Sequence, residues 1–459
     1  MKDQIVFGDS WLDVDLPDSI IEIPSSLSIP MPGVTDISSS IADAIERPID
    51  RPPLADLARK AKKVLVAFDD ATVPCYAPVW EHGLNAIVSA LVDGGVDERN
   101  IELVCANALH RQFTFDELSR LIGTDLTNRF RDRIGCHDAE SPDMVEVGRT
   151  ATGHVVDLSK KAVDADLVVY LNCSTTRGFS GGWKSISVGL SSYRCIAQHH
   201  APDTMSMSID RNRMHEVLDE MGGTTEQELG SDTFFKVETV LANPLEPAAF
   251  FGGSVGGTRA AALEMNRAHM PPRRTLVEEP CDVILYGVPE WSPYAAYSFN
   301  NPILSLVSTG LGYLGGMIEA VGKKGCTVIL ANPCRDVWDS DRHPSYKEVW
   351  DRVLPETKDP YEAKDRYEQE FAERPDYIEK YRNQFAFHGS HGIMALYPLK
   401  RLRHAGRVIV AGAESKSTPE HIGFDWASSV EAAIGSAKDD HGSDARIAFV
   451  RYPAAFNRA

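Results

Sequence analysis

Residues 166–172 read Asp-Leu-Val-Val-Tyr-Leu-Asn, and residues 177–184, shortly after them, read Arg-Gly-Phe-Ser-Gly-Gly-Trp-Lys. A continuous apolar run predicts a strand that is buried on both faces, as in a parallel sheet covered by helices. The glycine-rich turn that follows is typical of a loop whose backbone N–H groups approach a phosphate. This stretch therefore predicts an α/β domain with a ligand-binding loop at the end of a strand.

Apolar runs of similar length recur along the whole chain, with helical patterns between them. This alternation favours an α/β fold made of two α/β domains with mostly parallel sheets and a cleft between them. The helical signals include a capping-box pattern that begins at Thr114 and a proline near the start of a helix at Thr418–Glu420. The predicted strands are 64–68, 101–106, 167–171, 283–287, 327–331, 408–411 and 447–450.

The chain has 459 residues, a length that suggests two domains. A boundary is predicted at residues 270–274 (Met-Pro-Pro-Arg-Arg), because two adjacent prolines separate one α/β series from the next. We therefore predict a first domain at residues 1–270 and a second at 271–459. A charged and aromatic stretch at about 335–382 predicts helices inserted in the second domain.

The composition limits the classes of partner. A net charge of -19 disfavours nucleic acids and anionic membranes as partners. No apolar run approaches the roughly 18–20 residues that span a bilayer, and the N-terminus lacks the apolar core of a signal peptide. The eight cysteines form no C-x-x-C pair, so we expect reduced thiols and no zinc or iron–sulfur site. Together these features predict a cytoplasmic protein.

Lys184 is the most informative candidate residue, because it ends the glycine-rich turn. A lysine at such a point can pair with a phosphate or bond covalently to a cofactor. His200 follows 16 residues later, directly after His199, and an imidazole brought near by folding can ligate a metal. An ordinary strand-to-helix turn with a solvated lysine is the alternative that these residues alone leave open.

Three further stretches fit one pattern with the glycine-rich turn, and they do so in a fixed order. They are Asp69-Asp70-Ala71-Thr72-Val73-Pro74, Asn107-Ala108-Leu109-His110-Arg111 and Asn383-Gln384-Phe385. Together with the Gly-Phe-Ser-Gly-Gly-x-Lys run and His200, this order resembles the nickel-pincer lactate racemase family. The resemblance covers most of residues 1–275 and, more weakly, the rest of the chain.

The resemblance implies a racemase or epimerase of a 2-hydroxy acid that uses a nickel-pincer nucleotide. Lys184 would be the covalent attachment point and His200 the nickel ligand, with His199 as its competitor. His110 would take the proton of the substrate hydroxyl while a hydride passes to the cofactor, and Arg111 beside it would favour an anion. The remaining cofactor contacts would be Asp70 and Thr72 at the sugar hydroxyls, Ser180, Gly181 and Gly182 at the phosphate, and Phe385.

The same resemblance implies a role for each domain and the partners of the protein. The first domain would bind the cofactor and catalyse, and the second would close the cleft. The expected partners are a small hydroxylated acid as substrate and the maturation enzymes that load the cofactor.

The chain departs from the family at the groups that handle the substrate. The family's second catalytic histidine falls at Ser174, and a serine hydroxyl needs an activator to act as a base near neutral pH. The cations that anchor a substrate carboxylate are replaced by Val73 and, near the later position, Thr309. We therefore expect a substrate other than lactate, larger or less acidic. Open candidates are His199, Tyr193, His388 and His391 for the base, and Arg177, Arg111 and Arg194 for the carboxylate clamp.

Two other functions stay open at this point. Residues 310–315 (Gly-Leu-Gly-Tyr-Leu-Gly) match the G-x-G-x-x-G pattern of an NAD-dependent oxidoreductase, although no acidic residue follows at the place that grips a ribose. The departures at Ser174 and Val73 would also fit a non-catalytic homologue that binds the pincer cofactor. His343, His388 and His391 are further candidates as metal ligands.

Overall fold

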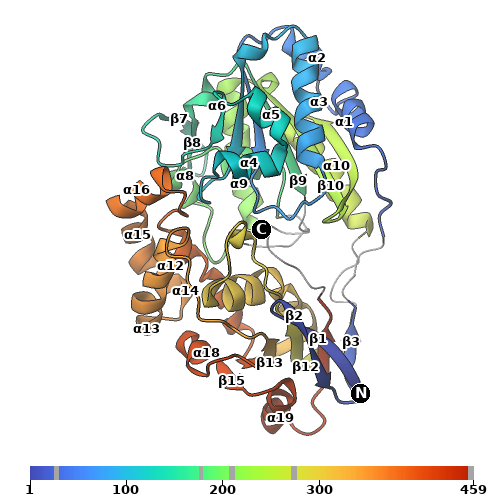
Figure 1. Cartoon of the computed structure of the whole chain (residues 1–459), viewed down its shortest axis with the longest axis vertical. Helices are drawn as coiled ribbons and strands as arrows, with labels where there is room; N and C mark the ends of the chain where they lie inside the picture. Colours follow the sequence, from blue (N-terminus) through green and yellow to red (C-terminus); the bar gives the residue numbers. More distant parts are fainter. Residues whose placement is uncertain (25–29, 175–178, 206–211, 270–275, 453–459) are drawn as a thin grey trace. The chain divides into compact units, whose positions relative to one another are not determined.

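The computed structural model of the chain describes residues 1–24, 30–174, 179–205, 212–269 and 276–452. It divides into two compact units (Figure 1). The N-terminal unit, as we call it, comprises Pro30–His269 and Lys380–Phe385, and the C-terminal unit comprises Met1–Ile29, Met270–Glu379 and Ala386–Ala459. Residues 1–29, predicted to lie in the first domain, thus belong to the C-terminal unit, because strand β3 there pairs with the last strand of the chain.

The N-terminal unit is built on a six-stranded sheet in the order β11–β10–β9–β4–β5–β6. All neighbouring pairs are parallel except β10 and β11, which are antiparallel. The chain runs from β4 outward through β5 to β6 and then continues on the other side of β4 with β9. The strand order therefore reverses beside β4, and α/β sheets bind ligands at such a switch point. The strands are β4 (Val64–Asp69), β5 (Ile101–Ala106), β6 (Ile134–Cys136), β9 (Leu167–Ser174), β10 (Phe234–Asn243) and β11 (Glu246–Gly253).

Helices in this unit begin where the sequence signals them. Thr114 Oγ1 accepts from the Glu117 N–H at 3.2 Å, and the Glu117 carboxylate accepts from the Thr114 N–H at 2.9 Å, so the predicted capping box is confirmed. The helices are α1 (Ile37–Glu46), α2 (Leu54–Ala58), α3 (Val79–Asp93), α4 (Phe115–Ile122), α5 (Thr124–Arg129), α6 (Lys160–Val163), α7 (Lys184–Ser187), α8 (Tyr193–Ile196), α9 (Arg213–Leu229) and α10 (Val255–His269). Short turns η1 (Glu98–Asn100) and η2 (Ser231–Thr233) and an antiparallel pair, β7 (Met144–Arg149) and β8 (Val155–Ser159), complete it.

The C-terminal unit has a second six-stranded sheet, in the order β15–β14–β13–β12–β16–β3, in which all pairs are parallel. The predicted α/β class with mostly parallel sheets is therefore confirmed. Helix α19 (Val430–His441) and the hairpin of β1 (Lys2–Phe7) and β2 (Ser10–Asp15) share one apolar core with this sheet. The strands are β3 (Ile21–Ile23), β12 (Cys281–Gly287), β13 (Gly322–Ala331), β14 (Arg407–Ala411), β15 (Asp425–Ala427) and β16 (Ile447–Val450).

The G-x-G-x-x-G run does not follow a strand. Gly310 and Gly312 lie inside η5 (Ile303–Tyr313), a wide π-type helix, and the Gly310 carbonyl accepts from the Tyr286 hydroxyl at 2.8 Å. The strand-to-helix turn that a dinucleotide site requires is therefore absent at these residues. The segment Ile303–Val321 has 19 residues and is apolar enough to cross a membrane by length and composition, which corrects the expectation from the sequence. It is 67% buried, as in the core helix of a folded domain.

Within the charged stretch at 335–382, short consecutive helices begin at Pro344. They bury aromatic and aliphatic side chains such as Tyr346 and Phe371 and expose ion pairs one turn apart, for example Lys347 with Asp351. The elements are α12 (Pro344–Glu348), η7 (Val349–Val353), α13 (Leu354–Glu356), α14 (Pro360–Ala363), η8 (Lys364–Glu368), α15 (Gln369–Glu373) and α16 (Pro375–Asn383). The other helical elements of the unit are η4 (Pro293–Ala295), η6 (Gly315–Met317), α11 (Ile318–Val321), α17 (His391–Met394), η9 (Tyr397–Arg403) and α18 (Ser417–Ile422).

Candidate active site

The predicted site residues of the N-terminal unit follow three neighbouring strands. Asp70 comes directly after β4, His110 lies four residues after β5, and the loop that ends at Lys184 follows β9. Because these strands are parallel, their carboxyl ends meet at one edge of the sheet, beside the switch point. The fold therefore gathers residues that are more than 100 positions apart in the sequence, as Asp70 and Lys184 are.

His110 is held by Asp70. Its Nδ1 lies 2.7 Å from Asp70 Oδ2, and the carboxylate is 3% exposed. The other oxygen of Asp70 accepts from the Thr72 N–H at 3.0 Å and from the Thr72 hydroxyl at 2.5 Å. Asp70 and Thr72, predicted to bind sugar hydroxyls, are thus engaged with each other and with His110 in this structure. A carboxylate at Nδ1 fixes the ring and leaves Nε2 as the proton-accepting nitrogen.

The loop that carries His110 is strained and firmly held. Ala108 has a φ of 51°, a conformation that costs free energy for a residue with a Cβ. The Ala108 carbonyl accepts from the Tyr381 hydroxyl at 2.8 Å, and the Asn107 side chain donates to the His110 carbonyl at 2.9 Å. Strain that surrounding bonds maintain is typical of functional sites, where it fixes a side chain before the substrate arrives.

Lys184 has an unusual amine. Burial lowers its pKa from 10.5 to about 7, with the charge of Arg259 acting in the same direction and those of Asp69 and Asp70 opposing it. The ammonium nitrogen lies 3.5 Å from the centre of the Phe179 ring. A pKa well below the ordinary value of a lysine makes the neutral, nucleophilic form of the amine available near neutral pH.

Asp69 is a second carboxyl group at this edge of the sheet. Its oxygens accept from the Tyr170 hydroxyl at 2.9 Å and from the Cys173 N–H at 3.0 Å. Burial nevertheless raises the pKa of Asp69 to about 7. Because Asp69 and Asp70 both act on the Lys184 amine, the end of β4 and the glycine-rich loop share one electrostatic environment.

His199 and His200 form a contact pair. Their Nδ1 atoms lie 2.9 Å apart, so one ring donates to the other. His199 is fully buried, and burial together with the charge of Lys184 lowers its pKa to about 3, which keeps it neutral. His200 is only partly buried. Both rings share this contact, so it does not choose between them, and the greater exposure of His200 is the feature that favours it as the ligand.

The glycine-rich loop is only partly the phosphate cradle that the sequence suggests. Gly181 and Gly182 have φ values of 88° and 58°, as a tight turn requires. The Gly182 N–H, however, donates to Glu238 Oε2 at 3.2 Å, so it is already used inside the protein. The Ser180 carbonyl accepts from Arg259. Gly182 thus anchors the loop, whereas Ser180 and Gly181 keep their predicted role as an expectation.

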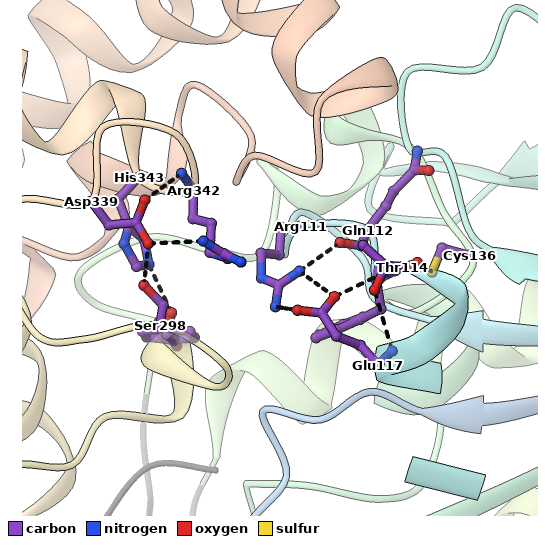
Figure 2. A network of polar contacts seen from close by, with 11 residues as sticks. Arg111, Gln112, Thr114, Glu117, Cys136, Ser298, Asp339, Arg342 and His343 are labelled. Atoms are coloured by element: carbon purple, nitrogen blue, oxygen red, sulfur yellow. Dashed lines mark hydrogen bonds and ion pairs between the residues drawn. The ribbon is translucent and has the colours of Figure 1, made fainter. Parts of the chain in front are cut away.

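Arg111 is bound within the protein (Figure 2). Its guanidinium donates to both oxygens of Glu117, at 2.9 and 2.7 Å, and stacks over the Phe113 ring at 4.5 Å. The residue is 1% exposed. A bidentate partner in a buried place gives Arg111 a structural role, which differs from the anion-binding role that the resemblance implied.

The other residues considered for binding the substrate carboxylate are Arg194, Arg177 and Thr309. Arg194 is more than half exposed and pairs with Glu146 at 3.0 Å, so it is engaged away from the loop. Arg177 lies outside the described residues. In the C-terminal unit, Thr309 is buried and its hydroxyl donates to the Trp291 carbonyl at 2.9 Å. These described positions offer no cation for a substrate carboxylate.

The histidines of the C-terminal unit are held by local partners. His388 Nδ1 lies 2.8 Å from Ser390 Oγ, His391 Nδ1 lies 2.8 Å from the Tyr346 hydroxyl, and His343 Nε2 lies 2.8 Å from a backbone carbonyl. Figure 2 also draws His343 with the neighbouring Asp339 network. Within the described ranges, no group of three or more His, Cys, Asp or Glu side chains is arranged to hold a metal ion.

Phe385 is the last residue of the segment that groups with the N-terminal unit. It has a φ of 56° and is 42% exposed, which is unusual for a large apolar side chain. Its role at the cofactor stays a prediction. All eight cysteines are free thiols, as predicted, and seven of them are buried.

The sequence reasoning missed two charged residues beneath the loop. Lys236 and Glu238 lie on β10, are fully buried and form an ion pair with 3.3 Å between Nζ and Oε2. Their signal was present in the run Phe234–Val240 (FFKVETV), where a lysine and a glutamate alternate with apolar residues that read as a strand.

The N-terminal part of the chain matches a known family. Residues 7–212 match the lactate racemase N-terminal domain. The chain is 23% identical over 309 residues to a lactate racemase from Lactiplantibacillus plantarum and 28% identical over 208 residues to one from Thermoanaerobacterium thermosaccharolyticum. These matches cover 65% and 44% of this chain. They cover 66% and 47% of the relatives, just under two thirds and about half of their lengths.

The fold is also found among solved structures. The chain is similar to the lactate racemase apoprotein from Thermoanaerobacterium thermosaccharolyticum, with a TM-score of 0.69 and 21% identity over 98% of each chain. It is less similar to a protein from Thermotoga maritima, with a TM-score of 0.54 and 14% identity over 90% of this chain and 94% of the other. At these identities the likeness establishes the fold.

Proposed function

We propose, from the premise that this chain is lactate racemase-like, that it is a racemase or epimerase of a 2-hydroxy acid whose nickel-pincer nucleotide is attached at Lys184. The relatives support a racemase-like enzyme, and the cofactor, the substrate class and a cytoplasmic location are our additions. One observation carries the proposal. Asp70, His110 and the loop that ends at Lys184 follow three neighbouring parallel strands, Asp70 holds His110, and His199 contacts His200.

The residues present fit this cofactor. An amine whose pKa is lowered by burial can bond to an activated acyl group, as Lys184 would. One imidazole, that of His200, would add a nitrogen donor to a nickel ion that the cofactor holds through soft donors. When bound, the cofactor would accept a hydride from the substrate carbon and return it. Dedicated maturation enzymes would have to supply it.

The protein's own residues would handle the proton and the substrate. His110, oriented at Nδ1 by Asp70, would take the hydroxyl proton at Nε2 and later return it. The strained loop around Ala108 would hold this ring in place. Apolar walls such as Phe179, next to the Lys184 amine, would keep water from the reacting carbon.

We expect the substrate to differ from lactate. Val73 replaces the cation of the loop after β4, and Thr309 offers only a hydroxyl that already bonds to Trp291. A small carboxylate without a cation would be poorly paired, which favours a larger hydroxylated acid held by several hydroxyl contacts. A panel of 2-hydroxy acids and sugar acids, followed by chiral chromatography of the products, measures this. Conversion of sugar acids at least ten times faster than lactate is expected, and strong activity on lactate alone would reject the expectation.

Attachment of the cofactor is tested by intact-mass spectrometry of protein co-expressed with pincer-cofactor maturation enzymes. A mass gain of one nucleotide-sized group is expected, and it should disappear in Lys184→Ala and in Lys184→Arg. The arginine variant keeps a positive charge but cannot form the amide-type bond. Lys160→Ala, which removes an exposed lysine, is the matched control and should load like the wild type.

The outcomes separate the alternatives. An unchanged mass in the wild type under full maturation conditions would reject the proposal. A mass gain without turnover on any substrate of the panel would favour a non-catalytic homologue that binds the cofactor. Tight binding of NAD by a nickel-free protein would favour an oxidoreductase, although the glycines of residues 310–315 lie within and directly after a buried helix.

A further inference from the structure

We propose that Lys236 and Glu238 are positioning residues that clamp the glycine-rich loop and thereby set the place of the Lys184 amine. The proposal rests on the proposed function only for the role of Lys184 as attachment point. The clamp itself is a property of the protein without cofactor. Neither residue belongs to a motif that the resemblance uses.

Glu238 binds the loop and the end of β9 at once. Its Oε2 accepts from the Gly182 N–H at 3.2 Å, and its Oε1 accepts from the Ser174 hydroxyl at 2.9 Å. Burial raises the pKa of Glu238, but the charges of Lys236 and Arg259 lower it more, so the net shift is downward and the group is ionised. A carboxylate gives shorter and stronger hydrogen bonds than a neutral acceptor does.

The ammonium group of Lys236 contacts the same part of the loop as Glu238 does. Its Nζ donates to the Gly182 carbonyl at 2.6 Å and to the Ser185 hydroxyl at 3.0 Å, and it lies 3.3 Å from Glu238 Oε2. Three acceptors match the three N–H bonds of the charged form. The pair therefore grips both the N–H and the carbonyl of Gly182, and Lys236 also holds Ser185, so the contacts flank Lys184 on both sides.

The fit between the pair and the loop leaves no room for a side chain. A Cβ at Gly181 would lie 2.0 Å from Glu238 Oε1 and 3.0 Å from Ser174 Oγ. A Cβ at Gly182 would approach Arg259 Cδ to 3.0 Å. Gly181 thus serves the close approach of the loop to Glu238, whereas Gly182 lies against Arg259, and both glycines also have positive φ values.

This arrangement also assigns Ser174 a role. Ser174 stands where the family has a second histidine, and here its hydroxyl proton points to the ionised Glu238. The negative charge of Glu238 is met by Lys236, so the hydroxyl is held as an anchor of the clamp. We infer that Ser174 belongs to the clamp and does not replace the missing base.

Fold stability alone does not explain the buried ion pair of Lys236 and Glu238. Replacing such a pair by apolar residues of similar volume is often neutral or stabilising for the fold, whereas removing one partner is strongly destabilising. A pair that is kept in a fully buried place and that directs its hydrogen bonds onto one loop is better explained by positioning. The double variant Lys236→Met/Glu238→Met removes the clamp and both charges of the pair together, so it separates positioning from the cost of leaving one partner of the pair alone.

The readout is the reactivity of each lysine in the cofactor-free protein. Trace acylation across pH 5–11, followed by peptide mass spectrometry, gives a titration curve for each amine, with the exposed Lys160 and Lys347 as internal references. In the wild type, the Lys184 curve should have its midpoint near the pKa of about 7. In the double variant, a loosened loop admits water to the amine, and the midpoint should rise by about one pH unit, which is about a fivefold fall in the neutral fraction of the amine at pH 7.

The direct charge of the pair does not confound this measurement. The influences on the Lys184 amine are burial and the charges of Asp69, Arg259 and Asp70, and the double substitution removes one positive and one negative charge together. An indirect effect runs through Asp69, because the charge of Lys236 lowers the pKa of Asp69 and the charge of Asp69 raises that of Lys184. Loss of Lys236 would therefore lower the Lys184 midpoint by this route, so a rise reports the position and burial of the amine.

Two further variants make the test specific. Val237→Ala removes a buried side chain that points to the opposite face of β10, so it should lower stability without moving the Lys184 curve. Lys236→Met/Glu238→Gln keeps an acceptor for the Gly182 N–H and should restore part of the wild-type curve. A folded double variant with an unchanged Lys184 curve would overturn the proposal, as would a shift of equal size in Val237→Ala. Either result is independent of whether the wild type gains cofactor mass.

Discussion

Asp70→Asn is expected to lower the kcat of the loaded enzyme by about 100- to 10,000-fold, the range that a positioned general base contributes. Asparagine can present its amide N–H to His110 Nδ1, which is 2.7 Å from the carboxylate oxygen in the wild type. That contact would place the ring proton on Nε2, where the substrate proton has to be accepted. KM should change little, because Asp70 acts through His110. Steady-state kinetics on the best substrate of the panel, with loading verified by mass, measures both constants.

The double variant Asp70→Asn/His110→Ala distinguishes this role from a general disturbance of the site. If Asp70 acts only by orienting His110, the double variant should be no slower than His110→Ala alone, since residues that act as a unit are not additive. Asp164→Asn, which alters an exposed carboxylate paired with Lys160, is the control and should retain full activity. A loaded Asp70→Asn enzyme with wild-type kcat would show that His110 needs no carboxylate, and the general-base role would then lose its structural support.

The core of each sheet was predictable because its strands carry their own signal. Runs such as Val64–Phe68 are apolar on both faces, and only a parallel sheet covered by helices buries both. The start of helix α4 after Thr114 was predictable for the same reason, because a capping box depends on only two residues three positions apart. By contrast, the pairing of β3 with β16 joins residues more than 400 positions apart, and no local pattern records it.

The site was partly predictable for a similar reason. Lys184 and His110 follow apolar strands, so their place at the carboxyl edge of the sheet could be inferred from the sequence. The partners that decide what each group does come from elsewhere, as Glu238 does for the glycine-rich loop. Asp70 illustrates the limit, because a carboxylate after a strand fits a sugar, a metal or a histidine equally well. Only the folded chain shows that the Asp70 carboxylate contacts His110.

Arg111 shows how a local signal in the sequence can be overlooked. Its partner Glu117 was visible as the glutamate of the capping box, only six residues away. The resemblance implies an anion-binding role for Arg111, but a glutamate six positions away in the sequence is itself a suitable anionic partner. In the structure the Glu117 carboxylate accepts both from the Thr114 N–H at the start of α4 and from the Arg111 guanidinium. The ion pair therefore connects the loop after β5 to helix α4.

Glu117→Leu is therefore expected to destabilise the protein by about 3–5 kcal/mol, the cost of leaving one partner of a buried ion pair uncompensated. Arg111 is 1% exposed, and its guanidinium would lose the carboxylate that accepts two of its hydrogen bonds. Arg111→Met/Glu117→Leu should recover most of the loss, because no buried charge remains. Urea unfolding of the full chain at pH 7, followed by circular dichroism, measures the difference between the two variants.

The pH dependence of this pair has a defined sign. Burial raises the pKa of Glu117, but Arg111 and the Thr114 contacts lower it more, so the net pKa is below the ordinary value of 4.5. A carboxylate whose pKa is lowered by folding stabilises above that value and loses the contribution as the pH falls through its folded pKa. The difference in the free energy of unfolding between the wild type and Arg111→Met/Glu117→Leu should therefore become smaller as the pH falls below 4.5. Glu146→Leu, at a partly exposed site paired with exposed arginines, should cost less than about 1 kcal/mol at any pH. If Arg111→Met instead kept full stability and lost substrate affinity, the arginine would return to the anion-binding role that its sequence neighbourhood suggests.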